Sequence, residues 1–178
     1  MHGREIKTVF PRPRAGIKGE SSREEAYGVL AGEDRFVREL LNPEVISVPS
    51  FMSLEAVSDF YRGEKKKPIL VVFDDGEPAY ALPEIDLARA NLARVDLDSP
   101  QTLHELLKDR VAVRCREDAI LADAIHEMVE YHISHVPVVS LHGGLIGTLS
   151  LLDIIGALSP PAAEKWLSKL RGWSAISP

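Results

Sequence analysis

Apolar positions recur twice along this chain in the same order, at a constant spacing of 67 residues. The identical pairs are Leu54 and Leu121, Val71 and Val138, Val72 and Val139, Gly76 and Gly143, Leu82 and Leu149, Asp86 and Asp153, and Ala90 and Ala157. They fall on apolar or special positions, where a repeated fold needs them, whereas chance matches would also scatter over the surface pattern. We therefore expect one structural unit that occurs twice.

The second copy carries a β-α-β-β-α pattern. Short β-rich runs predict strands over 111–115, 135–139 and 145–149. Between the first two strands, apolar residues at helical spacing predict a helix over 119–131. A Gly-Gly pair suits a hairpin turn between the last two strands, and Ser150 is expected to open a final helix.

The first copy follows the same order, with strands predicted over 44–48, 68–73 and 79–82. Ser53 is a candidate N-cap for its first helix, and Pro83 is expected to start its last helix. One such unit buries little surface, whereas two facing units cover each other's apolar sheets. The predicted fold class is α/β (α+β), with two pseudo-two-fold-related β-α-β-β-α units packed through their sheets.

Helical signals also flank the two units. Ser21 and Glu24 suggest a capping box for a short helix, and a second short helix is predicted over 34–41. Ser99-Pro100 is expected to begin a helix between the copies, and a last helix is predicted over 162–170. The predicted divisions are a basic N-terminal segment with short helices (1–42), a divergent first unit (43–93), a linker helix (94–109), a second unit (110–159) and a C-terminal helix with a tail (160–178).

The composition fits an ordinary globular protein, with 45% hydrophobic and 27% charged residues. No apolar run approaches the roughly 20 residues that cross a bilayer. The net charge of −6 argues against non-specific nucleic-acid binding, which depends largely on Lys and Arg, although the basic stretch over 1–18 keeps it as a weaker alternative. The single cysteine, Cys115, excludes an intramolecular disulfide and favours the reducing cytoplasm.

Three stretches of the second copy carry a family resemblance. They are Leu121-x-x-Ala124-x-x-x-Met128, Val136-Pro137-Val138-Val139 and Gly147-Thr148-Leu149-Ser150-Leu151-Leu152-Asp153. These stretches resemble a cystathionine-β-synthase (CBS) domain, and over roughly 43–158 the chain is similar to a tandem CBS pair, or Bateman module. The resemblance implies a regulatory homodimer, not an enzyme, that binds an adenosine-containing ligand such as AMP, ADP, ATP or S-adenosylmethionine between the two copies.

Ser150 and Asp153 are the central candidates for that ligand site. The Asp153 carboxylate can accept hydrogen bonds from both ribose hydroxyls, and the Ser150 hydroxyl can meet the ribose or the α-phosphate. The same spacing is also a helix capping box, which needs no ligand. The other candidates, for contacts to the adenine and the phosphates, are Val113, Arg114, Cys115, Arg116, Ser134, His135, Val136 and Pro137.

The equivalent site in the first copy is expected to be weaker. Asp86 is retained, but Pro83 stands in place of Ser150 and offers neither a hydroxyl nor an N–H. The candidates at this second site are Ile46, Ser47, Lys67, Pro68 and Asp86. Lys67 belongs to a run of lysines that is more simply explained as a solvated loop.

The leading hypothesis is a sensor of an adenosine nucleotide that acts through its own homodimer or through a separate effector protein, with no membrane partner. No catalytic residue, metal site or catalytic cofactor is expected, because the histidines lack metal-ligand spacing and the sequence places no activating neighbour beside Cys115. The alternative is a ligand-free dimerisation scaffold for a partner protein, which the divergence of the first copy favours.

Overall fold

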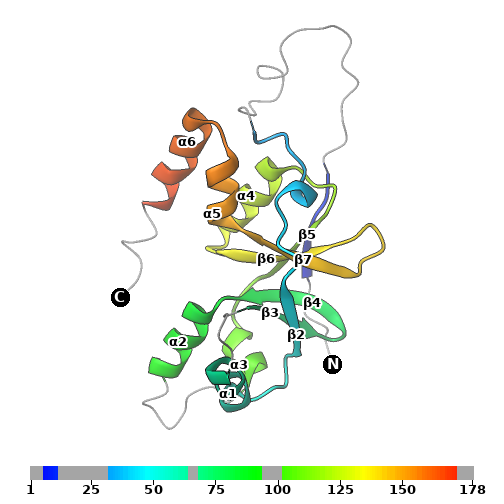
Figure 1. Cartoon of the computed structure of the whole chain (residues 1–178), viewed down its shortest axis with the longest axis vertical. Coiled ribbons are helices and arrows are strands. Elements are labelled where there is room, and N and C mark those ends of the chain that lie inside the picture. The colour runs from blue at the N-terminus through cyan, green and yellow to red at the C-terminus, as the bar shows by residue number, and fades with distance from the viewer. Residues whose placement is uncertain (1–5, 12–31, 64–67, 94–101, 172–178) are drawn as a thin grey trace, which may run out of the picture.

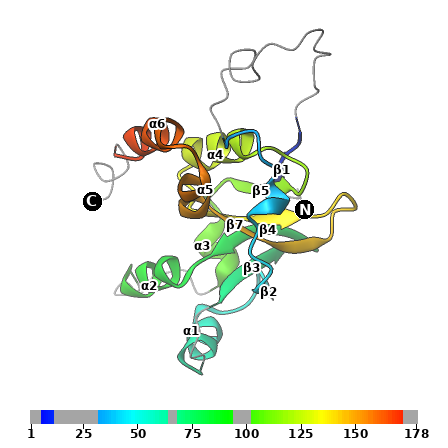
Figure 2. The same ribbon diagram turned by 45° about the horizontal axis from the view of Figure 1, so that its top comes forward.

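Two small β-sheets form the centre of the molecule, with helices around them (Figures 1 and 2). The computed structural model describes residues 6–11, 32–63, 68–93 and 102–171. One sheet has the strand order β1-β5-β6-β7, and the other has the order β2-β3-β4. The elements are β1 (Ile6–Val9), the 3-10 turn η1 (Val37–Glu39), β2 (Val45–Pro49), α1 (Leu54–Gly63), β3 (Ile69–Asp74), β4 (Glu77–Leu82), α2 (Glu84–Ala93), α3 (Leu103–Leu107), β5 (Ala112–Arg116), α4 (Leu121–Glu130), β6 (His135–Val139), β7 (Leu145–Ser150), α5 (Leu151–Ala157) and α6 (Pro160–Leu170).

The two sheets meet through β4, which contacts β5 and β6. Figure 1 shows α4, α5 and α6 beyond one sheet and α1, α2 and α3 beyond the other. Two apolar cores result, one around Leu121 and Ile154 and the other around Leu54 and Leu70. The predicted mixed α/β fold with two β-α-β-β-α units is confirmed. Among the described residues, no helix is both long and apolar enough to cross a membrane.

The repeat survives as equivalent elements in the two units. Helices α1 and α4 each span 10 residues, and they begin at Leu54 and Leu121, which keep the spacing seen in the sequence. Both of these residues are buried, at 1% and 0% exposure. Strands β2 and β5 keep the same spacing. The repeated apolar positions are therefore the buried face of each unit.

The gapless spacing is wrong by one residue across β3 and β6. Val71 of β3 lies opposite Ala81, whereas Pro137 of β6 lies opposite Thr148. Ala81 and Thr148 keep the spacing of 67 residues, but Val71 and Pro137 are 66 residues apart. The second hairpin turn compensates, because its tip holds one residue more than the tip of the first.

This shift changes which residues correspond between the two units. Pro68 and Ile69 of the first unit stand where the second unit has Ser134 and His135. The first unit therefore presents apolar side chains at the start of its central strand, where the second unit presents a hydroxyl and an imidazole.

The segment that precedes each unit packs on the other unit. Val37 in η1 donates its N–H to the Ala119 oxygen at 2.8 Å, and its side chain is fully buried in the core of the second unit. Leu103 in α3 donates its N–H to the Met52 oxygen at 3.0 Å and is fully buried in the core of the first unit. The two leading segments are thus exchanged between the units.

Both leading segments are shorter than predicted. The helix expected over 34–41 is only the 3-10 turn η1. The helix between the units is α3, whose N-cap is Thr102, with a capping box formed by Thr102 and Glu105. Ser99 is therefore not the N-cap of α3, because the nearer Thr102 satisfies the first helical N–H groups. Residues 21, 24, 99 and 100 lie outside the described part of the chain.

Strand β1 was not predicted, and it lies at the edge of the second unit's sheet. It pairs in parallel with β5, with Ile6 opposite Ala112. Lys7 forms an ion pair with Glu127 of α4 at 2.6 Å. Of its four residues only Val9 is buried, so the segment carries too little apolar periodicity to indicate a strand.

Gly147 in β7 lies against the leading segment that packs on the second unit. A Cβ at this position would lie 2.5 Å from the Asn42 oxygen and 2.9 Å from Leu41 Cδ1. Because a backbone oxygen in a paired segment cannot move aside easily, we expect Gly147→Ala to lower the free energy of unfolding by about 1–3 kcal/mol in urea titrations. Gly144→Ala is the matched control, since its Cβ would meet only Ser140 Oγ, at 3.6 Å. Equal stability of the two variants would contradict this packing.

Candidate functional site

A cleft of about 690 Å³ lies between the two units. Its walls come from β4 and the start of α2 in the first unit, from the connection before β5, and from the turn between α4 and β6 in the second unit. The lining residues are 79–82, 85, 86, 109–111, 113 and 131–135. Ligand pockets of roughly 300–1,000 Å³ are typical of drug-sized molecules, so the cleft has room for a nucleotide.

Asp86 places a carboxylate in this cleft. It lies in the first turn of α2, and its side chain is 18% exposed. Arg110, in the connection before β5, lies with its Nη1 3.3 Å from Asp86 Oδ2. An ionised carboxylate forms strong hydrogen bonds with hydroxyl donors, and its two oxygens suit the paired hydroxyls of a sugar.

Ser134 and His135 line the cleft from the second unit. Ser134 Oγ lies 3.0 Å from His135 Nδ1. Burial lowers the pKa of His135, although the carboxylates of Asp86 and Asp153 act in the opposite direction. His135 is therefore neutral at pH 7, so that one ring nitrogen can donate a hydrogen bond and the other can accept one.

Apolar and aromatic side chains complete the lining. Val113 and Leu82 are buried, whereas Ile85 is 56% exposed. Tyr80 and Tyr131 also line the cleft. Such a surface, with a few polar groups beside it, suits a flat apolar ring system such as a purine.

Residues from both predicted sites meet in this one cleft. Val113, Ser134 and His135 belong to the set predicted in the second copy, and Asp86 belongs to the set predicted in the first. The sequence groups candidates by unit, because spacing along the chain does not show which helix of the other unit faces a given strand.

Ser150 and Asp153 lie outside the lining of this cleft. Asp153 is exposed in the first turn of α5. Ser150 is the N-cap residue of α5, but its side chain makes no capping hydrogen bond. The capping box that these two residues could form is therefore not present, and the helix does not use the Ser150 hydroxyl.

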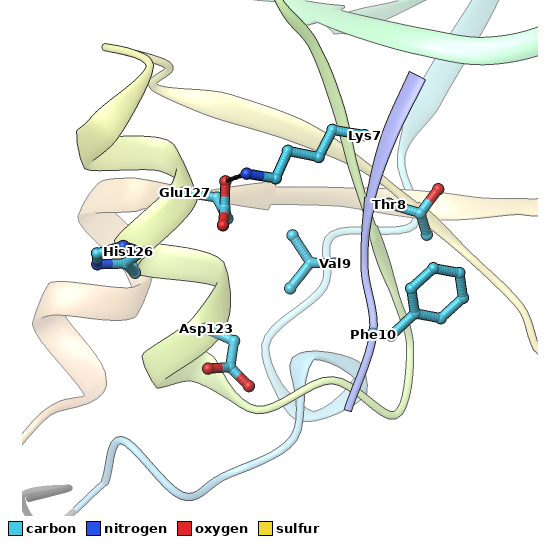
Figure 3. Close-up of a pocket in the computed structure, with 7 residues that line it drawn as sticks. All are labelled: Lys7, Thr8, Val9, Phe10, Asp123, His126 and Glu127. Atoms are coloured by element: carbon cyan, nitrogen blue, oxygen red, sulfur yellow. Dashed lines mark ion pairs between the residues drawn. The ribbon is translucent and has the colours of Figure 1, made fainter. Parts of the chain in front are cut away.

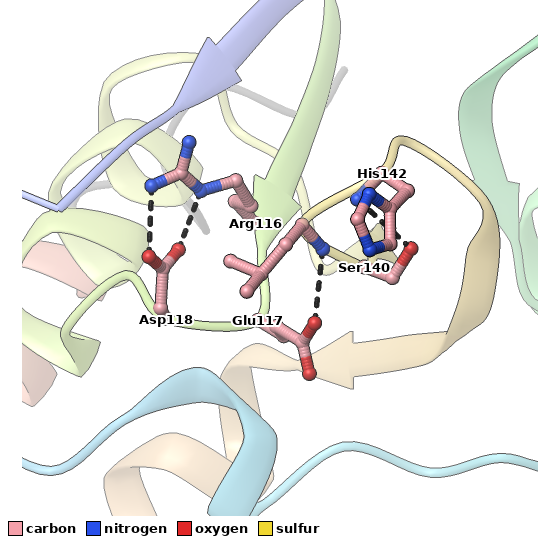
Figure 4. A network of polar contacts seen from close by, with 6 residues as sticks. Arg116, Glu117, Asp118, Ser140 and His142 are labelled. Atoms are coloured by element: carbon pink, nitrogen blue, oxygen red, sulfur yellow. Dashed lines mark hydrogen bonds and ion pairs between the residues drawn. The ribbon is translucent and has the colours of Figure 1, made fainter.

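The two arginines predicted beside the ligand are engaged within the protein. Arg116 forms a bidentate ion pair with Asp118, with N–O distances of 2.6 and 2.8 Å (Figure 4). This contact raises the pKa of Arg116 and lowers that of Asp118. Arg114 pairs with Glu77 and donates a hydrogen bond to Thr8 Oγ1 at 3.0 Å. Arg114 therefore connects β5 to β4 and to β1.

The remaining predicted residues do not line the cleft. Cys115 is fully buried in β5, which raises the pKa of its thiol. Val136 and Pro137 are buried in β6, Ile46 and Ser47 lie in β2, and Pro68 precedes β3. Lys67 lies outside the described residues.

Arg110, Tyr131 and His132 line the cleft without having been singled out in the sequence. Arg110 precedes β5, and the sequence signal for it is a basic residue next to the strand that holds Val113. His132 has a φ of +56°, in the left-handed region that non-glycine residues rarely adopt. This conformation turns the chain sharply from α4 towards β6, and no sequence signal marks it.

A smaller cavity of about 210 Å³ lies between β1 and α4 (Figure 3). Lys7 and Glu127 form an ion pair at its edge, and Asp123 and His126 line it from the helix. It is smaller than the pockets that usually hold a nucleotide-sized ligand. Within the described part of the chain, no group of three or more His, Cys, Asp or Glu residues is placed to hold a metal ion.

Protonation of His135 is expected to destabilise the fold at acidic pH. Burial lowers its pKa in the folded state, so the unfolded chain takes up the proton first as the pH falls below about 6.5. The stability that neutral His135 provides is complete above that pH and is lost as the pH falls towards the folded-state pKa.

We therefore expect the wild type to lose more free energy of unfolding than His135→Gln when the pH falls from about 7 to about 5. Urea unfolding at both pH values measures the two losses. His142→Gln, in the exposed hairpin turn, is the control and should behave like the wild type. Equal losses in the wild type and His135→Gln would contradict the effect of burial.

Residues 105–160 match the family model of the CBS domain. No curated protein matches the chain. Among solved structures, the CBS domain protein TA0289 from Thermoplasma acidophilum is similar with a TM-score of 0.57 at 18% identity, over 77% of this chain and 76% of that one. The CBS domain pair of protein MJ0100, in complex with 5′-methylthioadenosine and S-adenosyl-L-methionine, has a TM-score of 0.51 at 23% identity, over 67% and 92%. CBSX2 in complex with AMP has a TM-score of 0.50 at 21% identity, over 68% and 94%. These similarities establish the fold.

Proposed function

Because the chain belongs to the CBS-domain family and contains two CBS units, we propose that it is a regulatory module that binds an adenosine-containing nucleotide between them. One observation carries the proposal. Asp86 from the first unit and Ser134 and His135 from the second line the same cleft of about 690 Å³. A ligand there would contact both units, so its binding and their relative position would be linked.

The chemistry of the lining supports an adenosine ligand. The Asp86 carboxylate would accept hydrogen bonds from the ribose hydroxyls. Val113 and Ile85 would pack against the adenine, which needs apolar surface on its faces. Ser134 and neutral His135 would offer hydrogen bonds to the polar end of the ligand.

Structures of the same fold support this ligand class. CBSX2 was solved with AMP, and MJ0100 with 5′-methylthioadenosine and S-adenosyl-L-methionine. All of these ligands contain adenosine, and they differ in the group attached to the 5′ carbon of the ribose. The adenosine part is therefore the part that we propose the cleft of this chain to recognise.

Ser150 and Asp153 form a second proposed contact site. Asp153 occupies in α5 the position that Asp86 occupies in α2. The Ser150 hydroxyl makes no capping bond to α5, so it is available to a ligand. A nucleotide bound there would use the same carboxylate chemistry as at Asp86.

We propose that the module acts in the cytoplasm, as a homodimer or with a separate effector protein. A signal would require the nucleotide to bind two arrangements of the units with different affinity. The alternative is a ligand-free scaffold, and the exposed apolar side chains favour it. Phe51 and Leu152 are 78% and 73% exposed, and such residues suit contact with a protein partner.

Nucleotide binding predicts a difference between carboxylate variants. We expect AMP, ADP, ATP or S-adenosylmethionine to raise the melting temperature of the wild type in a thermal-shift assay. Asp86→Asn should weaken binding by about tenfold in calorimetry, because a charged acceptor is lost. Asp153→Asn should reduce the number of bound ligands if the second site is occupied.

Asp59→Asn is the matched control, since Asp59 lies in α1, away from the cleft, and pairs only with Arg62 among the described ion pairs. It should bind like the wild type. A wild type that none of these ligands stabilises would rule out the nucleotide sensor and leave the scaffold.

A further inference from the structure

We infer that Arg110 makes the cleft selective for nucleotides over nucleosides, by exchanging its bond to Asp86 for a bond to the ligand's phosphate. The inference rests on the proposed function and narrows its ligand to a phosphorylated adenosine. In the structure, Arg110 Nη1 lies 3.3 Å from Asp86 Oδ2, and both residues line the cleft. The carboxylate proposed for the ribose is therefore already held by a cation that a ligand must displace.

The backbone of Arg110 is fixed while its side chain can move. Its N–H donates to the Leu107 oxygen at 3.0 Å, at the end of α3. Its own carbonyl oxygen accepts a hydrogen bond from the Tyr80 hydroxyl of β4 at 3.3 Å. The side chain beyond this anchor is 49% exposed. The guanidinium can thus reorient in the cleft without any shift of the main chain.

The contact between Arg110 and Asp86 is of the kind that exchanges readily. It is a single contact of 3.3 Å, and half-exposed ion pairs contribute little to stability. A guanidinium has five N–H donors in a planar fork, which matches a phosphate better than one carboxylate oxygen. Exchange of Asp86 for a phosphate would therefore cost little and would gain a bidentate contact.

The charge balance of the cleft makes this exchange selective. Arg110 is the one Arg or Lys among the described residues that line it, and Asp86 and Asp109 are the acidic ones. When ribose hydroxyls occupy Asp86, Arg110 loses its partner. A phosphate on the same ligand replaces that partner, whereas an uncharged nucleoside does not. Adenosine should therefore bind more weakly than AMP.

The test compares AMP with adenosine by isothermal titration calorimetry on the full chain. We expect the wild type to bind AMP about tenfold more tightly than adenosine, the usual effect of one charged hydrogen-bond contact. Arg110→Gln should bind AMP about tenfold more weakly, while its affinity for adenosine should stay within about twofold of the wild type or increase. Arg110→Lys should keep part of the preference, because it keeps the charge but not the fork.

Arg62→Gln is the control, since Arg62 is exposed on α1 and pairs with Asp59. It should leave both affinities unchanged. An equal loss of AMP and adenosine binding in Arg110→Gln would overturn the inference, because it would show a structural role. So would unchanged affinities, or a wild type that binds adenosine as tightly as AMP, and both results leave the proposed function standing. A wild type that binds neither ligand would overturn the proposed function together with the inference.

Discussion

The core of each unit is completed by the segment that precedes the other unit. Val37 is fully buried among the residues of the second unit, and Leu103 and Leu107 are fully buried among those of the first. Burial of each such side chain contributes about 1.5–3 kcal/mol, so neither core is complete without the exchanged segment. The backbone bonds of Val37 to Ala119 and of Leu103 to Met52 fix the position of each segment. The two units are therefore held in one relative arrangement, and the face between their sheets results from it.

The cleft is a direct consequence of this exchange. Helix α3 is held on the first unit, whereas β5, the next element along the chain, belongs to the second. The short connection between them must cross from one unit to the other, and it carries Arg110 and Val113 along the boundary. The same crossing brings Asp86 of α2 into one cleft with residues 131–135. A binding surface built in this way cannot form in either unit alone.

The parts of this structure that local physics determines could be predicted from the sequence. The apolar periodicity of α1 and α4 marks their buried faces, so the duplicated units and most elements were predictable. The register of β3 against β6 was not, because two adjacent valines match at the wrong spacing and a longer hairpin hides the shift. Strand β1 was missed because its stability comes from pairing with β5 and from Lys7, not from its own pattern. The site residues were recognised in type, but their grouping depends on which unit faces which, and that is a tertiary property.

This grouping changes what the divergence of the first unit means. Compared within units, the loss of the Ser150 hydroxyl at Pro83 weakens the first unit's site. In the cleft, however, the first unit supplies the Asp86 carboxylate, and the second supplies the hydroxyl of Ser134 and the imidazole of His135. Neither unit needs a complete set, because each contributes what the other lacks. A ligand that uses Asp86 and His135 together must bridge the units, and any difference in its affinity for two arrangements of them becomes a difference in their populations.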